Sequence, residues 1–107
     1  MKLINKTTGH IISNQLKVAS SWVEASLGLL NQPKGTAMLF NTRWGIHTFG
    51  MKYPIDIIIL DQKLKVVQIK HQLQPNRIFF WNPKYSCIIE MAFKSKKSFS
   101  LGDTIKY

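Results

Sequence analysis

The chain has 107 residues, of which 45% are hydrophobic and 11% aromatic, and its formal net charge at pH 7 is +10. This apolar content excludes an intrinsically disordered chain, and the length predicts one domain over residues 1–107 with enough apolar surface for one core. The one cysteine, Cys87, excludes an internal disulfide framework and a multi-cysteine zinc site.

The sequence also bears on location. No apolar run approaches the length of a membrane span, which needs about 20 such residues. The N-terminal segment has no apolar block that matches the central region of a signal peptide. We therefore expect a cytoplasmic protein without a membrane span.

The first third of the chain predicts two short strands and one helix. Lys2–Asn5 and His10–Ser13 are strand-like and are separated by a turn at Thr8 and Gly9. Apolar residues then recur at helical spacing, with serines available to cap the start and Pro33 to end the pattern. This predicts a single helix near Ser20–Leu30.

From Thr36 onward the apolar pattern has the period of strands. Ile55–Leu60 is fully apolar except for Asp56, and Leu64–Ile69 reads as its return strand after a two-residue turn at Gln62 and Lys63. The other predicted strands are Ala37–Phe40, Ile46–Phe49, Arg77–Trp81, Ser86–Phe93 and Thr104–Tyr107.

Many short strands with one early helix predict a mostly β fold, at the margin of α+β. We expect a small antiparallel β-sandwich of jelly-roll-like form, or a partly open barrel. No repeat, linker or low-complexity tract divides it.

The positive charge has two interpretations. It could be an electrostatic footprint for nucleic acid or an anionic surface, or it could be spread over an ordinary solvated surface. Only Arg43 and Arg77 among the 15 basic residues are arginines, and the lysines are dispersed, which favours the second interpretation. Binding to polyanions would then be weak, non-specific and sensitive to salt.

Four polar residues in apolar surroundings are the candidates for a site: His47, Asp56, Arg77 and Glu90. Buried acids of this kind are normally hydrogen-bonded to backbone amides or paired with arginine, so the cluster could simply hold strands together. The alternative is a carboxylate–histidine site for acid–base chemistry or a divalent metal. Since phosphate loops, dinucleotide-binding glycine patterns, HExxH and GxSxG are absent, we predict no cofactor or metal site and assign no catalytic residue.

Two further features have structural and functional readings. Phe79, Phe80 and Trp81 could stack on nucleobases, but adjacent residues in a strand point alternately in and out. At most one side of the trio is therefore available, and core packing is the favoured role. Cys87 is expected to be a buried structural thiol, because no neighbouring feature lowers its pKa.

Two neighbouring motifs carry a resemblance to a known family. Ile46–Met51 reads IHTFGM, and Tyr53–Asp56 reads YPID. With these motifs the chain resembles the domain-of-unknown-function family 192, in the branch whose signature has HTFGM followed by a proline, an aliphatic residue and an aspartate. The supporting signature residues are Thr48, Gly50, Met51 and Pro54.

What this resemblance implies is limited to the fold. The family is similar to small jelly-roll-like β-sandwiches, and it offers no catalytic residue to carry over. Leu27–Leu30 is similar to the family's RGLLGR element, but both arginines are missing, which removes any anion contact that relatives make there.

The sequence therefore predicts a small β-domain of binding or accessory type, with a small molecule or a protein as partner. One alternative is an enzyme that uses His47 with Asp56 or Glu90 for acid–base or metal-assisted chemistry. The other is a polyanion-binding module driven by its lysines. Convergence of the polar side chains in an open pocket would favour the enzyme.

Overall fold

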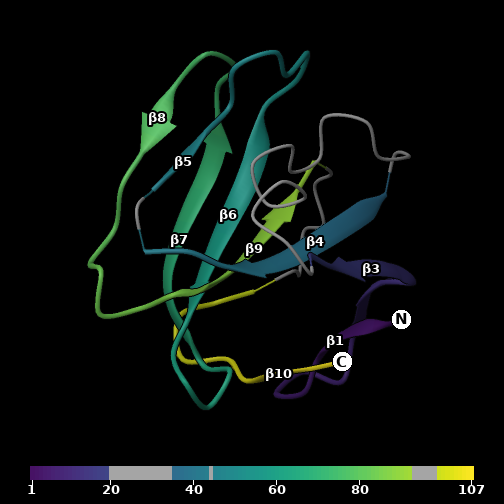
Figure 1. The fold of residues 1–107 in the computed structure, drawn as a ribbon. Coiled ribbons are helices and arrows are strands. Elements are labelled where there is room, and N and C mark those ends of the chain that lie inside the picture. Colours follow the sequence, from purple (N-terminus) through teal and green to yellow (C-terminus); the bar gives the residue numbers. More distant parts are fainter. Residues whose placement is uncertain (20–34, 44, 93–98) are drawn as a thin grey trace.

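The computed structural model describes residues 1–19, 35–43, 45–92 and 99–107. In this part of the chain the structure consists of strands and contains no helix (Figure 1). The strands are β1 (Leu3–Asn5), β2 (Ile11–Ser13), β3 (Gln15–Val18), β4 (Thr36–Asn41), β5 (Ile46–His47), β6 (Ile55–Leu60), β7 (Val66–Leu73), β8 (Ile78–Phe79), β9 (Cys87–Met91) and β10 (Ile105–Lys106).

The mostly β fold predicted from the sequence is confirmed. The helix predicted near Ser20–Leu30 lies outside the described residues. Within those residues, no helix is long and apolar enough to cross a membrane.

A five-stranded sheet in the order β3-β4-β9-β6-β7 forms the centre of the molecule. Its pairs are antiparallel except β3 and β4, which are parallel. All six residues of β6 are buried, because other strands cover both faces of the sheet. A strand that is buried on both sides reads as a continuous apolar run, and this explains Ile55–Leu60.

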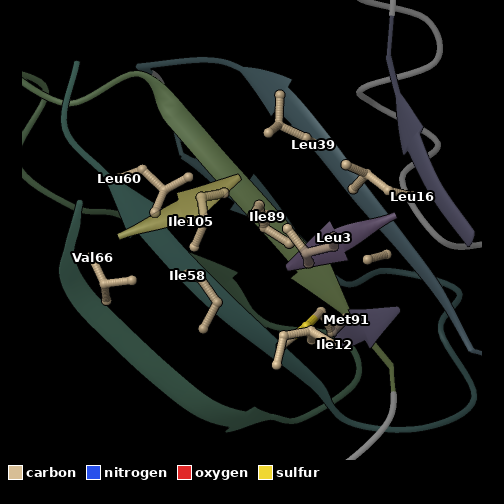
Figure 2. Packing of buried hydrophobic residues seen from close by; sticks show 11 residues of the cluster. Leu3, Ile12, Leu16, Leu39, Ile58, Leu60, Val66, Ile89, Met91 and Ile105 are labelled. Atoms are coloured by element: carbon tan, nitrogen blue, oxygen red, sulfur yellow. The ribbon is translucent and has the colours of Figure 1, made fainter. Parts of the chain in front are cut away.

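One face of this sheet packs against a second, three-stranded sheet in the order β10-β1-β2. Figure 2 shows side chains of Leu3 and Ile105 from the small sheet among Ile58, Ile89 and Leu60 from the large one. The two chain ends are adjacent because β1 pairs with β10 (Figure 1).

The opposite face of the large sheet is covered in part by a two-stranded ribbon, β5 paired with β8. Ile46 and Trp81 join the second core cluster with Ile57, Ile59 and Ile88 from the large sheet. In Figure 1 the ribbon lies away from β1 and β10. The large sheet is open, with β3 and β7 at its edges, so the architecture is a layered sandwich and not a closed barrel.

The β6–β7 connection differs from the two-residue turn expected at Gln62 and Lys63. The Leu64 N–H donates to the Asp61 carbonyl at 3.1 Å, and the Asp61 N–H donates to the Lys65 carbonyl at 3.0 Å. Leu64 has a φ of 62°, so the loop is a tight turn followed by a left-handed residue. A leucine occupies this position because its side chain packs against the first core cluster.

Candidate functional site

Thr48, within the IHTFGM motif, joins the ribbon to the loop that follows β7 by a set of hydrogen bonds that we call the Thr48 clasp. Its hydroxyl donates to the Gln74 carbonyl at 2.7 Å and accepts from the Arg77 N–H at 2.9 Å. Its own N–H donates to the Arg77 carbonyl at 2.9 Å, and its carbonyl accepts from the N–H groups of Asn76 and Met51. The Thr48 side chain is fully buried. Thr48 therefore holds two loops in register.

The Asp56 carboxylate accepts hydrogen bonds from a β-bulge in the neighbouring strand β7. Ile55 pairs with Leu73 and Ile57 with Lys70, so two residues of β7, His71 and Gln72, lie opposite Asp56. Gln72 has a φ of 53°, and its N–H and Nε2 donate to Asp56 Oδ1 at 2.8 and 3.2 Å. The exposed His71 places Nδ1 3.6 Å from Asp56 Oδ2. A backbone amide thus accounts for the acid in this apolar strand.

Glu90 points to the other face of the same sheet. Asp56 pairs with Met91, whereas Ile57 pairs with Glu90, and successive residues of a strand alternate between faces. Glu90 lies between Met38 and Ile57 at the second core cluster, and no hydrogen bond or ion pair with a described residue reaches its carboxyl. Desolvation by burial raises the pKa of Glu90 to about 8, so this side chain is neutral at pH 7.

The four polar residues singled out from the sequence thus take separate positions. Asp56 and Glu90 are buried on opposite faces, while His47 and Arg77 are exposed. Within the described residues, no hydrogen bond or ion pair joins the side chains of any two of the four. The partners of Asp56 are instead His71 and Gln72, which no sequence motif marks.

The outward face of the ribbon carries His47 together with aromatic and aliphatic side chains. Ile46 pairs with Phe79 and both turn toward the second core, so the paired residues His47 and Ile78 turn outward. The rings of His47 and Phe49 are stacked with centroids 5.0 Å apart and planes 21° from parallel. The Phe49 N–H donates to His47 Nδ1 at 3.3 Å. A neutral imidazole that accepts through Nδ1 carries its proton on Nε2.

Phe80 continues this outward face over Gly45. A Cβ on Gly45 would lie 2.6 Å from Phe80 Cδ1 and 2.9 Å from the Phe79 carbonyl oxygen. Gly45 also has a φ of 90°, so both backbone conformation and space require glycine there. Phe49, Ile78 and Phe80 are 51%, 56% and 67% exposed. We call His47, Phe49, Ile78 and Phe80 the ribbon face.

The chain's two arginines precede the two strands of the ribbon. Arg77 immediately precedes β8, and its backbone is fixed by the Thr48 clasp. Arg43 lies before β5, where Nη1 donates to the carbonyls of Pro83 and Lys84 at 2.6 and 3.1 Å. Both side chains are exposed. Along the chain, one arginine therefore precedes each strand of the ribbon.

The remaining candidates are structural or lack the grouping that a metal needs. Trp81 is buried, and its Nε1–H donates to the Tyr85 carbonyl at 2.7 Å, so core packing is its role as expected. Burial raises the pKa of the Cys87 thiol, which keeps it protonated. In the stretches that the structure describes, no three His, Cys, Asp or Glu side chains are grouped so as to hold a metal ion.

Comparison with known proteins identifies relatives along the whole chain. Residues 3–107 match the family model DUF192, described as "Uncharacterized ACR". The UPF0127 protein PH1112 of Pyrococcus horikoshii is 30% identical over 113 residues, covering 98% of this chain and 97% of that protein. A UPF0127 protein of Thermococcus sibiricus is 36% identical over 89 residues, covering 77% of this chain and 56% of that protein.

Two solved structures have a similar fold. A protein of unknown function from Novosphingobium aromaticivorans has a TM-score of 0.76 and 17% identity, covering 100% of this chain and 84% of its own. A Sinorhizobium meliloti protein described as a "putative transcription regulator" has a TM-score of 0.67 and 19% identity, covering 98% and 89%. At these identities the likeness concerns the fold alone.

Proposed function

The chain belongs to the domain-of-unknown-function family 192, and we propose that it is a binding module whose ribbon face takes up single-stranded nucleic acid. The observation that carries this proposal is the exposure of aromatic rings on one face of a ribbon that has an arginine directly before β8.

Stacking would supply the affinity for bases. Phe49 and Phe80 present rings to solvent, and the His47 ring is held parallel to Phe49. Stacking of a base on an aromatic side chain contributes about 1–3 kcal/mol and tolerates any base, because each has a π face. Nε2–H of a neutral His47 adds a donor for a base or phosphate oxygen.

Charge would supply the affinity for the phosphate backbone. The net charge of +10 attracts any polyanion, and guanidinium groups bind phosphate through paired hydrogen bonds. The pairing of β5 with β8 sets Arg77 at one end of the aromatic surface. A strand lying along the ribbon could meet the exposed Arg77 at one end of the stacked bases.

This proposal divides the four polar residues between two roles. His47 and Arg77 belong to the binding surface, whereas Asp56 and Glu90 support the fold. An acid–base site would need His47 beside a carboxylate, and the contacts of His47 within the described residues are with Phe49. We therefore favour binding over catalysis.

Fluorescence anisotropy with a labelled single-stranded 12-mer, as RNA and as DNA, tests the proposal. The variants are Phe49→Ala and Phe80→Ala, and the matched control is Leu101→Ala, because Leu101 on a turn is as exposed as Phe80, at 67%. We expect each phenylalanine variant to bind roughly ten-fold more weakly, as the loss of one stacked base predicts, and Leu101→Ala to match wild type.

Two results would overturn this assignment. One is equal affinity of all four proteins, which would leave only diffuse attraction to charge. The other is tighter binding to vesicles containing phosphatidylserine than to the 12-mers, with the same dependence on Phe80, which would make the ribbon face a membrane contact. Melting temperatures of the variants check that each is folded. We also propose a cytoplasmic location, which fractionation of cells expressing the tagged chain would test.

A further inference from the structure

A cleft of about 720 Å³ opens where the β6–β7 loop, the end of β4 and the segment before β9 meet. Leu39 and Leu60, both buried in the first core, form its floor, and the more exposed Leu64, Tyr85 and Tyr107 add apolar surface to its wall. Its volume falls within the range of pockets that hold small organic ligands. None of these residues belongs to the ribbon face.

The charged side chains of this cleft are mostly cationic. Arg43, Lys63, Lys65 and Lys84 line it, and Asp61 is the one acidic side chain among the lining residues. Asp61 Oδ1 already accepts the N–H groups of Lys63 and Lys65, at 2.8 and 2.9 Å. The carboxylate is thus engaged in shaping the loop.

The cationic groups are carried by segments with fixed backbones. The Asp61 contacts set the loop that bears Lys63 and Lys65, and the Arg43 guanidinium is anchored on the Pro83 and Lys84 carbonyls. These carbonyl contacts leave the positive charge of Arg43 uncompensated. A site that is ordered before binding loses less conformational freedom when a ligand arrives.

We propose that this cleft binds a small organic phosphate, with its phosphate groups among the lysines and Arg43 and its organic part on the wall formed by Leu64, Tyr85 and Tyr107. Phosphate groups fit the charge, because cationic side chains bind them through charge-assisted hydrogen bonds. A bare phosphate ion would leave the apolar wall and most of the volume unfilled. The organic part therefore contributes to binding.

Isothermal titration calorimetry at low ionic strength, with adenosine diphosphate, inorganic pyrophosphate and adenosine as probes, tests the site. We expect adenosine diphosphate to bind more tightly than pyrophosphate, and adenosine to give no measurable heat. The variant Lys63→Gln/Lys84→Gln should weaken binding of adenosine diphosphate at least ten-fold. Its charge-matched control is Lys17→Gln/Lys106→Gln, since both of these exposed lysines lie outside the cleft lining.

The control variant should bind like wild type. Equal loss in the two double variants would overturn the proposal, because it would show attraction to overall charge alone. If pyrophosphate bound as tightly as adenosine diphosphate, the inference that the organic part contributes to binding would be overturned. Phe80→Ala separates the two sites: it should leave adenosine diphosphate binding unchanged, and a loss there would place the ligand on the ribbon face.

Discussion

Asp56 and Glu90 show how neighbouring strands give similar acids opposite environments. Each lies among isoleucines in its strand. Asp56 pairs with Met91 and Glu90 pairs with Ile57, so the two acids are offset by one residue across the β6–β9 pair. Asp56 meets a backbone amide that the β7 bulge leaves free of the ladder. Glu90 meets only apolar neighbours from β4 and β6 along its row. The sequence context of the two residues is alike, so only the pairing register distinguishes a satisfied carboxylate from a desolvated one.

The raised pKa of Glu90 predicts a stability that falls as pH rises. Between the ordinary value of 4.5 and the folded value of about 8, the unfolded chain releases a proton that the folded chain keeps. The free energy of unfolding then decreases by up to about 1.4 kcal/mol for each pH unit in this window and is flat on either side. The Gln side chain of Glu90→Gln cannot ionise. The free energy of unfolding of this variant should therefore rise progressively relative to that of wild type from pH 5 to pH 8.

Urea unfolding of wild type and Glu90→Gln at several pH values measures this difference. Asp61→Asn is the control, because Asp61 is a loop carboxylate outside the core. When the free energy of unfolding is plotted against pH, the curves for wild type and Glu90→Gln should lie close together near pH 5 and separate above it. A constant difference across the range would contradict the assignment of Glu90 as a buried neutral acid.

At the scale of elements, strands buried on both sides were the easiest to predict. Ile55–Leu60 is a continuous apolar run because sheet β10-β1-β2 and the ribbon cover its two faces. Strand β3, Gln15–Val18, was missed, since only Leu16 is buried there and the strand lies at the edge of the sheet. Edge strands have one pairing partner and a weaker apolar signal.

The ribbon face could be predicted only in part. The IHTFGM motif drew attention to His47, but Ile78 and Phe80 lie about thirty residues further along the chain. Their meeting depends on the pairing of β5 with β8, which is only two residues long in each strand. No periodic signal accompanies so short a pair. The clasp at Thr48 holds it in register from the side.

Removing the Thr48 hydroxyl should therefore weaken the attachment of the ribbon. In Thr48→Val the Arg77 N–H and the Gln74 carbonyl lose their partner while the shape of the side chain is kept. The expected loss of stability is about 2–3 kcal/mol, the penalty for leaving such groups unpaired. Thr48→Ser keeps the hydroxyl and should lose only about 1 kcal/mol, for one buried methyl group. Urea midpoints give both values, and a valine variant as stable as the serine variant would show that the clasp contributes nothing.

At the scale of the whole molecule, the proposed binding of a single strand would draw on charge and on aromatic surface as separable contributions. The net charge of +10 acts at a distance and is screened by salt. Stacking on Phe49 and Phe80 acts in contact and depends little on ionic strength. The dispersed lysines favour the interpretation of the charge as an ordinary solvated surface. The ribbon adds what composition could not reveal, which is a surface where exposed aromatic side chains gather.

Salt titration of binding to the single-stranded 12-mer separates these contributions. The logarithm of the affinity falls linearly with the logarithm of the salt concentration, by about 0.7 per phosphate contacted on a single strand. Arg77→Gln removes one such contact at the end of the ribbon, so its slope should be shallower by about 0.7. Phe80→Ala keeps every cation, so its line should run parallel to that of wild type at a lower affinity. Lines for wild type and Phe80→Ala that converge at high salt would show that Phe80 acts through charge placement and not through stacking.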